Sequence, residues 1–491
     1  MRFASRTSRH LARTIVVVAL AILILLALAW RPAVAPIEPP AASGFDPALI
    51  RRGAELAALG DCSTCHTTRG GSTFAGGRAI PTPFGSIYST NITPDPSTGI
   101  GRWSSRAFAR AMREGVDREG RHLYPAFPYD HFTLLTDADI DALYAFFMTR
   151  PPVRAQTSRN DVPFPLSFRP LLAGWKLLFF RPGRYHADAQ RDAVWNRGAY
   201  LAEGIAHCGA CHTPRNAFGA EKPNQHFAGG SAEGWHAYSL NSMSQAPLAW
   251  DVSAMELYLR NGWHASHGVA HGPMAAVTDN MAGVTASDVR AVAEYVVASM
   301  SGTKGARPNS LAGKTDAEGT RRSSRASMAS LATAPPAAAI SPTHPTAPVP
   351  PAAADPPTRS GAPTPGSSLQ PATTPSASAA VAAASDDKRS DGAAIYAAAC
   401  GGCHESHQPL PFGGVDLSLS TDVAGEDPTN LVHVVLDGLP ATREAPQPMM
   451  PGFATTFSDP QLVSLMAYLR DQFAHKPLWP DTESAIRRNP Q

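Results

Sequence analysis

Three copies of one five-residue pattern constrain this chain more than any other feature. Each copy reads Cys-x-x-Cys-His, and together the copies use all six cysteines of the 491 residues. The cysteines are Cys62, Cys65, Cys208, Cys211, Cys400 and Cys403, and the histidines that follow are His66, His212 and His404. At this composition chance would supply about 0.003 such matches. The pattern is typical of covalent attachment of c-type haem.

The chemistry of haem attachment explains the spacing. Two thiols three residues apart on one helical turn can each form a thioether with a haem vinyl group, and the next histidine then lies under the iron as an axial ligand. A zinc site would need four ligands, and a thioredoxin-like pair would need no histidine, so we favour haem over both. The sequence predicts three haem c groups.

The surroundings of the motifs repeat as well. A glycine lies 8 to 10 residues before each motif, and each unit closes with a helix-start signal followed by an aromatic residue ten positions later. The glycines are Gly53, Gly198 and Gly392; the helix-start signals are Thr136-x-x-Asp139, Thr285-x-x-Asp288 and Ser458-x-x-Gln461; the aromatics are Phe146, Tyr295 and Tyr468. We expect the last helix of each unit to cross the first helix at the glycine.

This arrangement resembles three class I cytochrome c domains in series, which implies an all-α fold built around haem. The expected organisation is a membrane anchor or signal peptide (1–35), a first cytochrome domain (45–150), a connector (151–188), a second domain (189–300), a linker (301–388), a third domain (389–475) and a C-terminal tail (476–491). The linker is rich in Pro, Ala, Ser and Thr and has no aromatic residue, so it cannot bury a core.

A methionine is the expected second axial ligand, because a thioether opposite histidine raises the haem potential. In the second unit Met274 follows Cys208 by 66 residues, and in the third Met450 follows Cys400 by 50 residues. A proline lies next to each methionine, as a rigid ligand loop requires. Met449 is the competitor of Met450.

The first unit departs from this rule. Its equivalent position is Phe127, which cannot bind iron. We rank His131 first as the axial ligand there, followed by Met112 and then His122; an open coordination site is the alternative.

The N-terminus is typical of an exported protein. Arginines at positions 2, 6, 9 and 13 precede an apolar run from Thr14 to Trp30, and the 17 residues of this run would span about 26 Å as a helix. A retained anchor and a cleaved signal both remain open, and in either case the bulk of the chain would lie outside the cytoplasm.

The charge balance and the missing motifs exclude other functions. The chain has 42 Lys and Arg against 40 Asp and Glu, so nothing indicates a nucleic acid partner. Neither a dinucleotide-binding glycine motif nor a P-loop is present, so substrate oxidation must take place on a partner.

Three segments, 82–95, 123–132 and 211–216, resemble the triheme cytochrome c subunits of bacterial membrane-bound dehydrogenases. The resemblance implies an inner-membrane subunit with its haem domains facing the periplasm. Such subunits accept electrons from a dehydrogenase catalytic subunit and pass them to ubiquinone or a terminal oxidase.

Phe127 followed by Asp130-His131-Phe132 is more similar to the subunits that serve molybdenum hydroxylases for aldehydes or nicotinate. The alternatives are a quinoprotein alcohol dehydrogenase and a flavin-dependent gluconate-type dehydrogenase. Two further classes are a haem peroxidase that uses an open site at the first haem, and a subunit of a respiratory oxidase.

Overall fold

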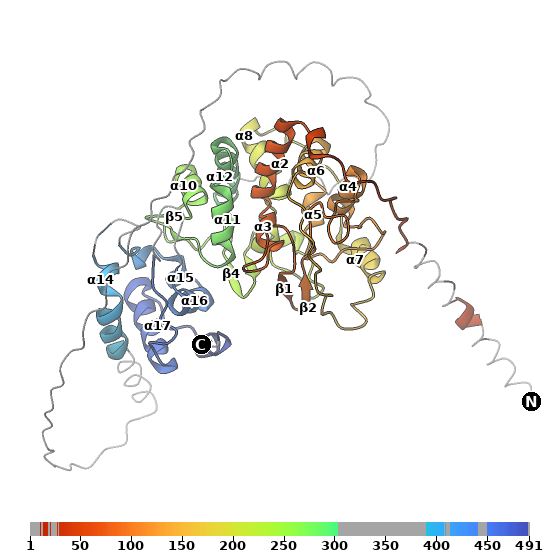
Figure 1. Cartoon of the computed structure of the whole chain (residues 1–491). Helices are drawn as coiled ribbons and strands as arrows, with labels where there is room; N and C mark the ends of the chain where they lie inside the picture. The colour runs from red at the N-terminus through yellow and green to blue at the C-terminus, as the bar shows by residue number, and fades with distance from the viewer. Residues whose placement is uncertain are drawn as a thin grey trace, which may run out of the picture. The chain divides into compact units, whose positions relative to one another are not determined.

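In the computed structural model (Figure 1) the described residues are 29–302, 389–406, 408, 413–439 and 449–489, with a few separate positions before residue 29. The predicted linker therefore falls almost entirely outside the described residues, as does most of the predicted anchor. Among the described residues no helix combines the length and apolar composition needed to span a membrane.

The first unit is a set of short helices around one hairpin. Its elements are η1 (Ala42–Gly44), α2 (Pro47–Leu59), α3 (Cys62–Cys65), β1 (Ala79–Thr82), β2 (Gly85–Tyr88), α4 (Ser105–Glu114), α5 (Tyr129–Phe132) and α6 (Asp137–Met148). Asp46 accepts a hydrogen bond from the amide of Ala48 and Pro47 occupies the first turn, so α2 begins at a strong helix-start signal.

The connector contributes one helix, and the second unit, like the first, consists of short helices and strand pairs. Their elements are α7 (Leu171–Phe179), α8 (Ala193–Tyr200), the π-helical turn η2 (Leu201–Ile205), α9 (Gly209–His212), η3 (Pro223–Gln225), β3 (Gly230–Ala232), β4 (Trp235–Ala237), α10 (Val252–Asn261), β5 (Trp263–His264), β6 (Gly268–Val269), α11 (Pro273–Met281) and α12 (Ala286–Met300). Each of the three strand pairs of the described chain is antiparallel and two-stranded.

The third unit has helices and no strand pair in its described part. A helical segment over residues 389–399 is followed by α14 (Gly401–His404), η4 (Leu417–Leu419), α15 (Thr421–Ala424), α16 (Thr429–Asp437), α17 (Asp459–Ala474) and α18 (Thr482–Arg488). The expected C-terminal tail is thus not plain coil, because α18 buries Ala485 and Ile486 in the core of this unit together with Trp479.

The predicted helix crossing at a glycine is confirmed in all three units. A Cβ on Gly53 would lie 2.0 Å from the carbonyl oxygen of Ala142, and one on Gly392 would lie 2.1 Å from that of Ser464. In the second unit the corresponding distance, from Gly198 to Ala291, is 1.9 Å. The backbones of α2 and α6, which lie side by side in Figure 1, touch only because no side chain separates them.

Two expectations of the sequence need correction. The fold is mostly helical but not purely α, because three short hairpins lie between the helices. At Thr285 the helix begins where the sequence predicts, but the Thr285 side chain makes no capping hydrogen bond; the Asp288 amide donates to the Thr285 backbone carbonyl instead. Thr136 and Ser458 cap their helices as predicted.

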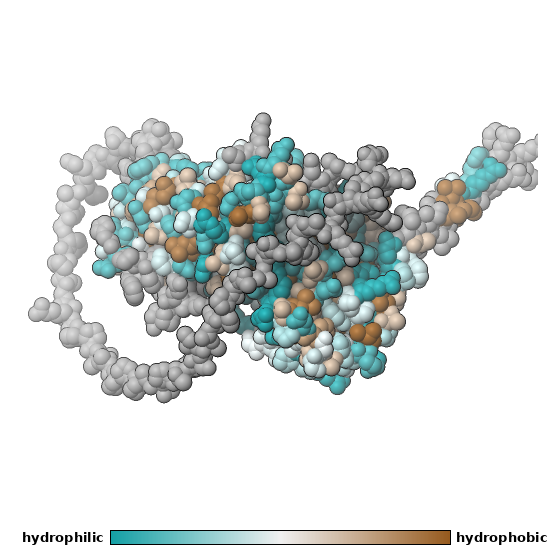
Figure 2. All heavy atoms as spheres, turned by 90° about the horizontal axis from the view of Figure 1, so that it is seen from above, coloured by the Kyte–Doolittle hydropathy of each residue, from teal (hydrophilic) through white to brown (hydrophobic). Residues whose placement is uncertain are grey.

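The first two units share one core, and the third has its own. A continuous cluster of buried apolar side chains runs from Leu56 of α2 to Val296 of α12, and a separate cluster begins at Tyr396. On the face seen in Figure 2, hydrophobic residues form small separate groups among polar ones. The first two units are thus joined through a shared apolar interior.

Candidate functional site: three haem-attachment motifs

Each Cys-x-x-Cys-His motif lies on a single helical turn, as its spacing requires. The amides of His66, His212 and His404 each donate to the carbonyl of the first cysteine of their motif at 3.0 Å. This i to i−4 bond brings both thiols to one side of the turn, next to the histidine. The same local geometry thus occurs three times on three separate elements, α3, α9 and α14.

The three motif histidines share a second feature that fits iron ligation. The Nδ1 atom of His66 lies 2.6 Å from the carbonyl of Thr90, that of His212 lies 2.6 Å from the carbonyl of Tyr238, and that of His404 lies 2.9 Å from the carbonyl of Val415. Such a bond fixes Nδ1 as the protonated nitrogen and leaves Nε2 as the donor to a metal. Burial lowers the pKa of His66 and His212, which keeps the rings neutral.

The thiols of the first two motifs do not have the character of redox thiolates. Burial raises the pKa of Cys62, Cys65 and Cys208 to about 12 and that of Cys211 to about 11. A thioredoxin-like cysteine would instead have its pKa lowered by nearby positive charge. Among the described residues, the group of three potential metal ligands that lie close together is Asp130, His131 and Glu221, and it includes no motif cysteine.

The second and third motifs open into an apolar cavity that fits porphyrin. The cavity is lined by Cys208, Cys211 and His212 of the second motif and by Cys400, Cys403 and His404 of the third. Met274 and Met450, the predicted axial methionines, both line it. Met449 lines it too, but only Met450 packs against the core of the third unit. This mostly apolar lining, with two thiol pairs, two motif histidines and methionines on it, suits a porphyrin.

At the first motif the structure changes the ranking of axial candidates. Both ring nitrogens of His131 are engaged, Nδ1 by the carbonyl of Glu203 at 2.7 Å and Nε2 by the Glu221 carboxylate at 2.8 Å. Both nitrogens of His122 are engaged as well, by the Ala29 carbonyl and by the Lys176 ammonium. Met112 is buried among apolar side chains of the first unit.

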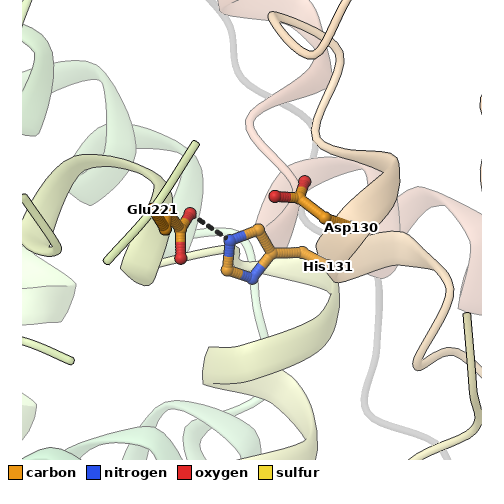
Figure 3. Close-up of side chains that lie close together, drawn as sticks. All are labelled: Asp130, His131 and Glu221. Atoms are coloured by element: carbon orange, nitrogen blue, oxygen red, sulfur yellow. Dashed lines mark hydrogen bonds and ion pairs between the residues drawn. The ribbon is translucent and has the colours of Figure 1, made fainter. Parts of the chain in front are cut away.

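Figure 3 shows what His131 does instead. It points from α5 of the first unit to Glu221, which follows the second motif, while Asp130 lies to one side. Burial alone would lower the pKa of His131, but the Glu221 carboxylate outweighs it and raises that pKa to about 10. A protonated imidazole has no lone pair for iron, so this histidine forms a buried ion pair that joins the two units.

The first two motifs lie close together. Asn280 of α11 donates to Asp61, the residue before Cys62, at 2.5 Å. His207, the residue before Cys208, lies 3.3 Å from the carbonyl of Gly60. Residues that flank the two attachment sites therefore contact each other directly.

An arginine network adds a further tie between the first two units. Arg52 of α2 pairs with Asp139 at 3.1 Å inside its own unit and with Asp288 of the second unit at 3.2 Å. Arg197 of α8 also pairs with Asp288, at 2.7 Å. This network was not predicted, although the sequence carries a signal for it: an arginine precedes both Gly53 and Gly198, and an aspartate occupies the same position of both closing helices.

Tyr238 connects the second motif to the third unit. Its carbonyl holds His212, and its hydroxyl donates to Asp422 of α15. The amide of His236 also donates to the side chain of Asn430 on α16 at 2.9 Å. The segment that holds His212 is therefore linked to α15 and α16 of the third unit by polar bonds.

Comparison with known proteins agrees with this geometry. The family model for cytochrome c matches residues 50–151, and the model for subunit III of cbb3-type cytochrome c oxidase matches residues 387–469. The chain is 40% identical over 474 residues to one of the subunits of nicotinate dehydrogenase from Pseudomonas putida, a match that covers 94% of this chain and 34% of that relative. The chain thus spans about a third of the length of the nicotinate dehydrogenase protein.

Two other relatives are matched over most of their length. The chain is 31% identical to the fructose dehydrogenase cytochrome subunit of Gluconobacter japonicus, over 90% of this chain and 82% of that one. It is 33% identical to the gluconate 2-dehydrogenase cytochrome c subunit of Pantoea cypripedii, over 87% of this chain and 86% of that one. The chain belongs to the family of cytochrome c subunits of dehydrogenases.

Proposed function

We propose that this chain is a three-haem electron-transfer subunit that passes electrons from a partner dehydrogenase to ubiquinone or a terminal oxidase. The observation that carries the proposal is the threefold recurrence of one geometry: two thiols and a histidine on one turn, with Nδ1 held by a backbone carbonyl. When bound, haem supplies a one-electron couple at each motif. We further propose that the chain is held at the bacterial inner membrane with its haem domains facing the periplasm.

The residues of the chain itself have three roles in this function. The thiols would hold each haem covalently, and the carbonyl-bound histidines would offer Nε2 as a ligand to the iron. Apolar walls exclude water, which keeps the potential under the control of the ligands. The contacts of His207 with Gly60 and of Asn280 with Asp61 support an arrangement in which the first two haem groups would belong to one packed body.

The proposed partner is a molybdenum hydroxylase-type dehydrogenase. The segment Phe127 to Phe132 and the similarity to a nicotinate dehydrogenase protein support this choice. The other relatives keep two alternatives open, a quinoprotein alcohol dehydrogenase and a flavin-dependent gluconate-type dehydrogenase. Co-purification of the large subunit distinguishes them: molybdenum in the complex supports the proposal, and pyrroloquinoline quinone or flavin without molybdenum contradicts it.

Mass spectrometry of the mature chain tests the number of haem groups. We expect three covalent haem adducts in the wild type and two in each of the double variants Cys62→Ala/Cys65→Ala, Cys208→Ala/Cys211→Ala and Cys400→Ala/Cys403→Ala. The variant unit should also lose helicity, because a domain of about 90 residues lacks enough apolar mass without porphyrin. A wild-type mass without adducts would overturn the proposed function.

Carbon monoxide binding tests the axial ligands. We expect Met274→Leu and Met450→Leu each to bind one more CO per reduced chain than the wild type, because leucine leaves the sixth position of one iron open. Met449→Leu is the matched control and should bind no more CO than the wild type. Met112→Leu should bind one more CO than the wild type if Met112 ligates the first haem. If Met449→Leu, and not Met450→Leu, binds the additional CO, then Met449 is the ligand in the third unit.

A further inference from the structure

The connector helix α7 turns its apolar side to solvent. Leu171, Gly174, Leu177 and Leu178 are all exposed, with Leu177 at 77% and Leu178 at 64%. These positions recur at intervals of three and four residues, so they lie on one face of the helix, which we call the outer face of α7. A helix at an ordinary protein surface turns its apolar side chains inward and its charged side chains to solvent.

Polar bonds on the inward side of α7 prevent the helix from turning its apolar face toward the protein interior. Its single charged residue, Lys176, is buried, and its ammonium group donates to the carbonyls of Glu114 and Gly115 at 2.6 and 2.7 Å. These carbonyls end α4, which lies beside α7 in Figure 1, and a cation at a helix C-terminus is favourable. Trp175 also donates to the carbonyl of Phe218 at 2.9 Å. The orientation of the outer face is therefore fixed by polar bonds.

The stretch that leads into α7 adds further exposed apolar side chains. Phe164 is 84% exposed and Phe168 is 47% exposed. Phe218, which stacks on Phe179 of α7, is 66% exposed. Exposed apolar residues concentrated in this way mark a protein or membrane contact.

The charge of the segment favours an anionic surface. From residue 162 to residue 187 the chain contains no aspartate or glutamate. Arg169 lies just before α7 and Arg181 lies just after it, where it donates to the carbonyl of Leu177. An apolar face flanked by arginines is typical of helices that lie in the headgroup region of a bilayer containing anionic lipid.

The N-terminal segment enters the folded body at the same place. The carbonyl of Ala29 lies 2.8 Å from Nε2 of His122, and Nδ1 of His122 lies 3.1 Å from the Lys176 ammonium. Ala29 is near the end of the apolar run that the sequence marks for the membrane. The chain therefore passes from that run to within two hydrogen bonds of α7.

We propose that the outer face of α7 is a second membrane contact, embedded in the interface of a bilayer with anionic headgroups. This inference rests on the proposed membrane location and specifies which side of the haem body faces the lipid. A partner subunit or a second copy of the chain would be the competing occupants.

Photolabelling of the full haem-loaded chain tests the proposal. The protein is bound to vesicles of phosphatidylethanolamine and phosphatidylglycerol that contain a membrane-partitioning diazirine, and adducts are mapped by mass spectrometry. We expect labelling of residues 164–181 to exceed that of a segment around Leu248 and Leu257 by about tenfold. The variant Leu177→Ser/Leu178→Ser should lose this labelling, whereas the control Leu248→Ser/Leu257→Ser should keep it.

The outcomes separate this inference from the proposed function. Labelling confined to the N-terminal run would overturn the role of α7 while leaving the membrane location intact. No labelling anywhere would contradict both. If residues 164–181 are labelled only weakly and Leu177→Ser/Leu178→Ser turns a dimer into a monomer, the face is an interface between copies and the membrane proposal is wrong.

Discussion

Replacing His131 by leucine is expected to lower the free energy of unfolding of the body formed by the first two units by about 3–5 kcal/mol. The variant leaves the Glu221 carboxylate buried without its cation and leaves the Glu203 carbonyl without a donor. Arg215, at 3.8 Å from Glu221, is too distant to replace both bonds. Denaturant unfolding followed by far-UV circular dichroism measures the change.

Two controls show whether the loss comes from the ion pair. His131→Leu/Glu221→Leu removes both charges and should recover most of the lost stability, because apolar pairs of similar volume replace buried ion pairs well. Glu483→Gln breaks an exposed pair with Arg487 and should cost less than about 1 kcal/mol. A double variant as unstable as His131→Leu alone would show that cavity formation, and not charge, causes the effect.

The same pair predicts a pH dependence. Burial opposes ionisation of Glu221, but the His131 cation outweighs it and lowers the pKa of the carboxyl from 4.5 to about 2. The Glu221 contribution is thus complete above pH 4.5 and is lost as the pH falls toward 2. The His131 contribution is complete below pH 6.5 and is lost as the pH rises toward 10. The difference in free energy of unfolding between the wild type and His131→Leu/Glu221→Leu should therefore be largest between pH 4.5 and pH 6.5.

Gly53→Ala is expected to destabilise the first unit by about 3 kcal/mol or more. The added Cβ would lie 2.0 Å from the carbonyl oxygen of Ala142 and 2.6 Å from the Cβ of Phe146. Both contacts involve backbone or the base of a side chain, so α2 and α6 must move apart. Because α2 leads directly into the first haem motif, this variant should also yield a smaller fraction of chains with the first haem attached, as measured by mass spectrometry.

Gly44→Ala is the matched control for this substitution. A Cβ at Gly44 would meet nothing within 4 Å, and the residue lies in the same N-terminal region. We expect a change of less than about 0.5 kcal/mol and full haem attachment. Equal losses in both variants would contradict the assignment of Gly53 to a helix crossing.

The helix crossings could be predicted from the sequence because they depend on local spacing that repeats. A glycine 8 to 10 residues before each motif and an aromatic residue ten positions after each helix-start signal encode the same contact three times. The one-turn geometry of the motifs was predictable for the same reason. Haem attachment itself and the axial methionines stay predictions, which the lining of the cavity supports.

The role of His131 could not be predicted, because it depends on contacts between residues far apart in the chain. Nothing near His131 in the sequence indicates that Glu221, ninety residues later, takes one of its nitrogens. The hairpins also escaped prediction, since their strands have only two to four residues and hardly any alternating pattern. The inward turn of Lys176 depends in the same way on the end of a distant helix.

The arginine that joins the first two units has a consequence for electron flow. Arg52 pairs with one aspartate in each unit, whereas the third unit has Asp391 and Gln461 at the matching places and cannot form the same pairs. An electron that moves between the first two sites would therefore tunnel across a gap set by side-chain packing. Its rate would be independent of solvent viscosity, in contrast to a step that waits for two bodies to meet by diffusion.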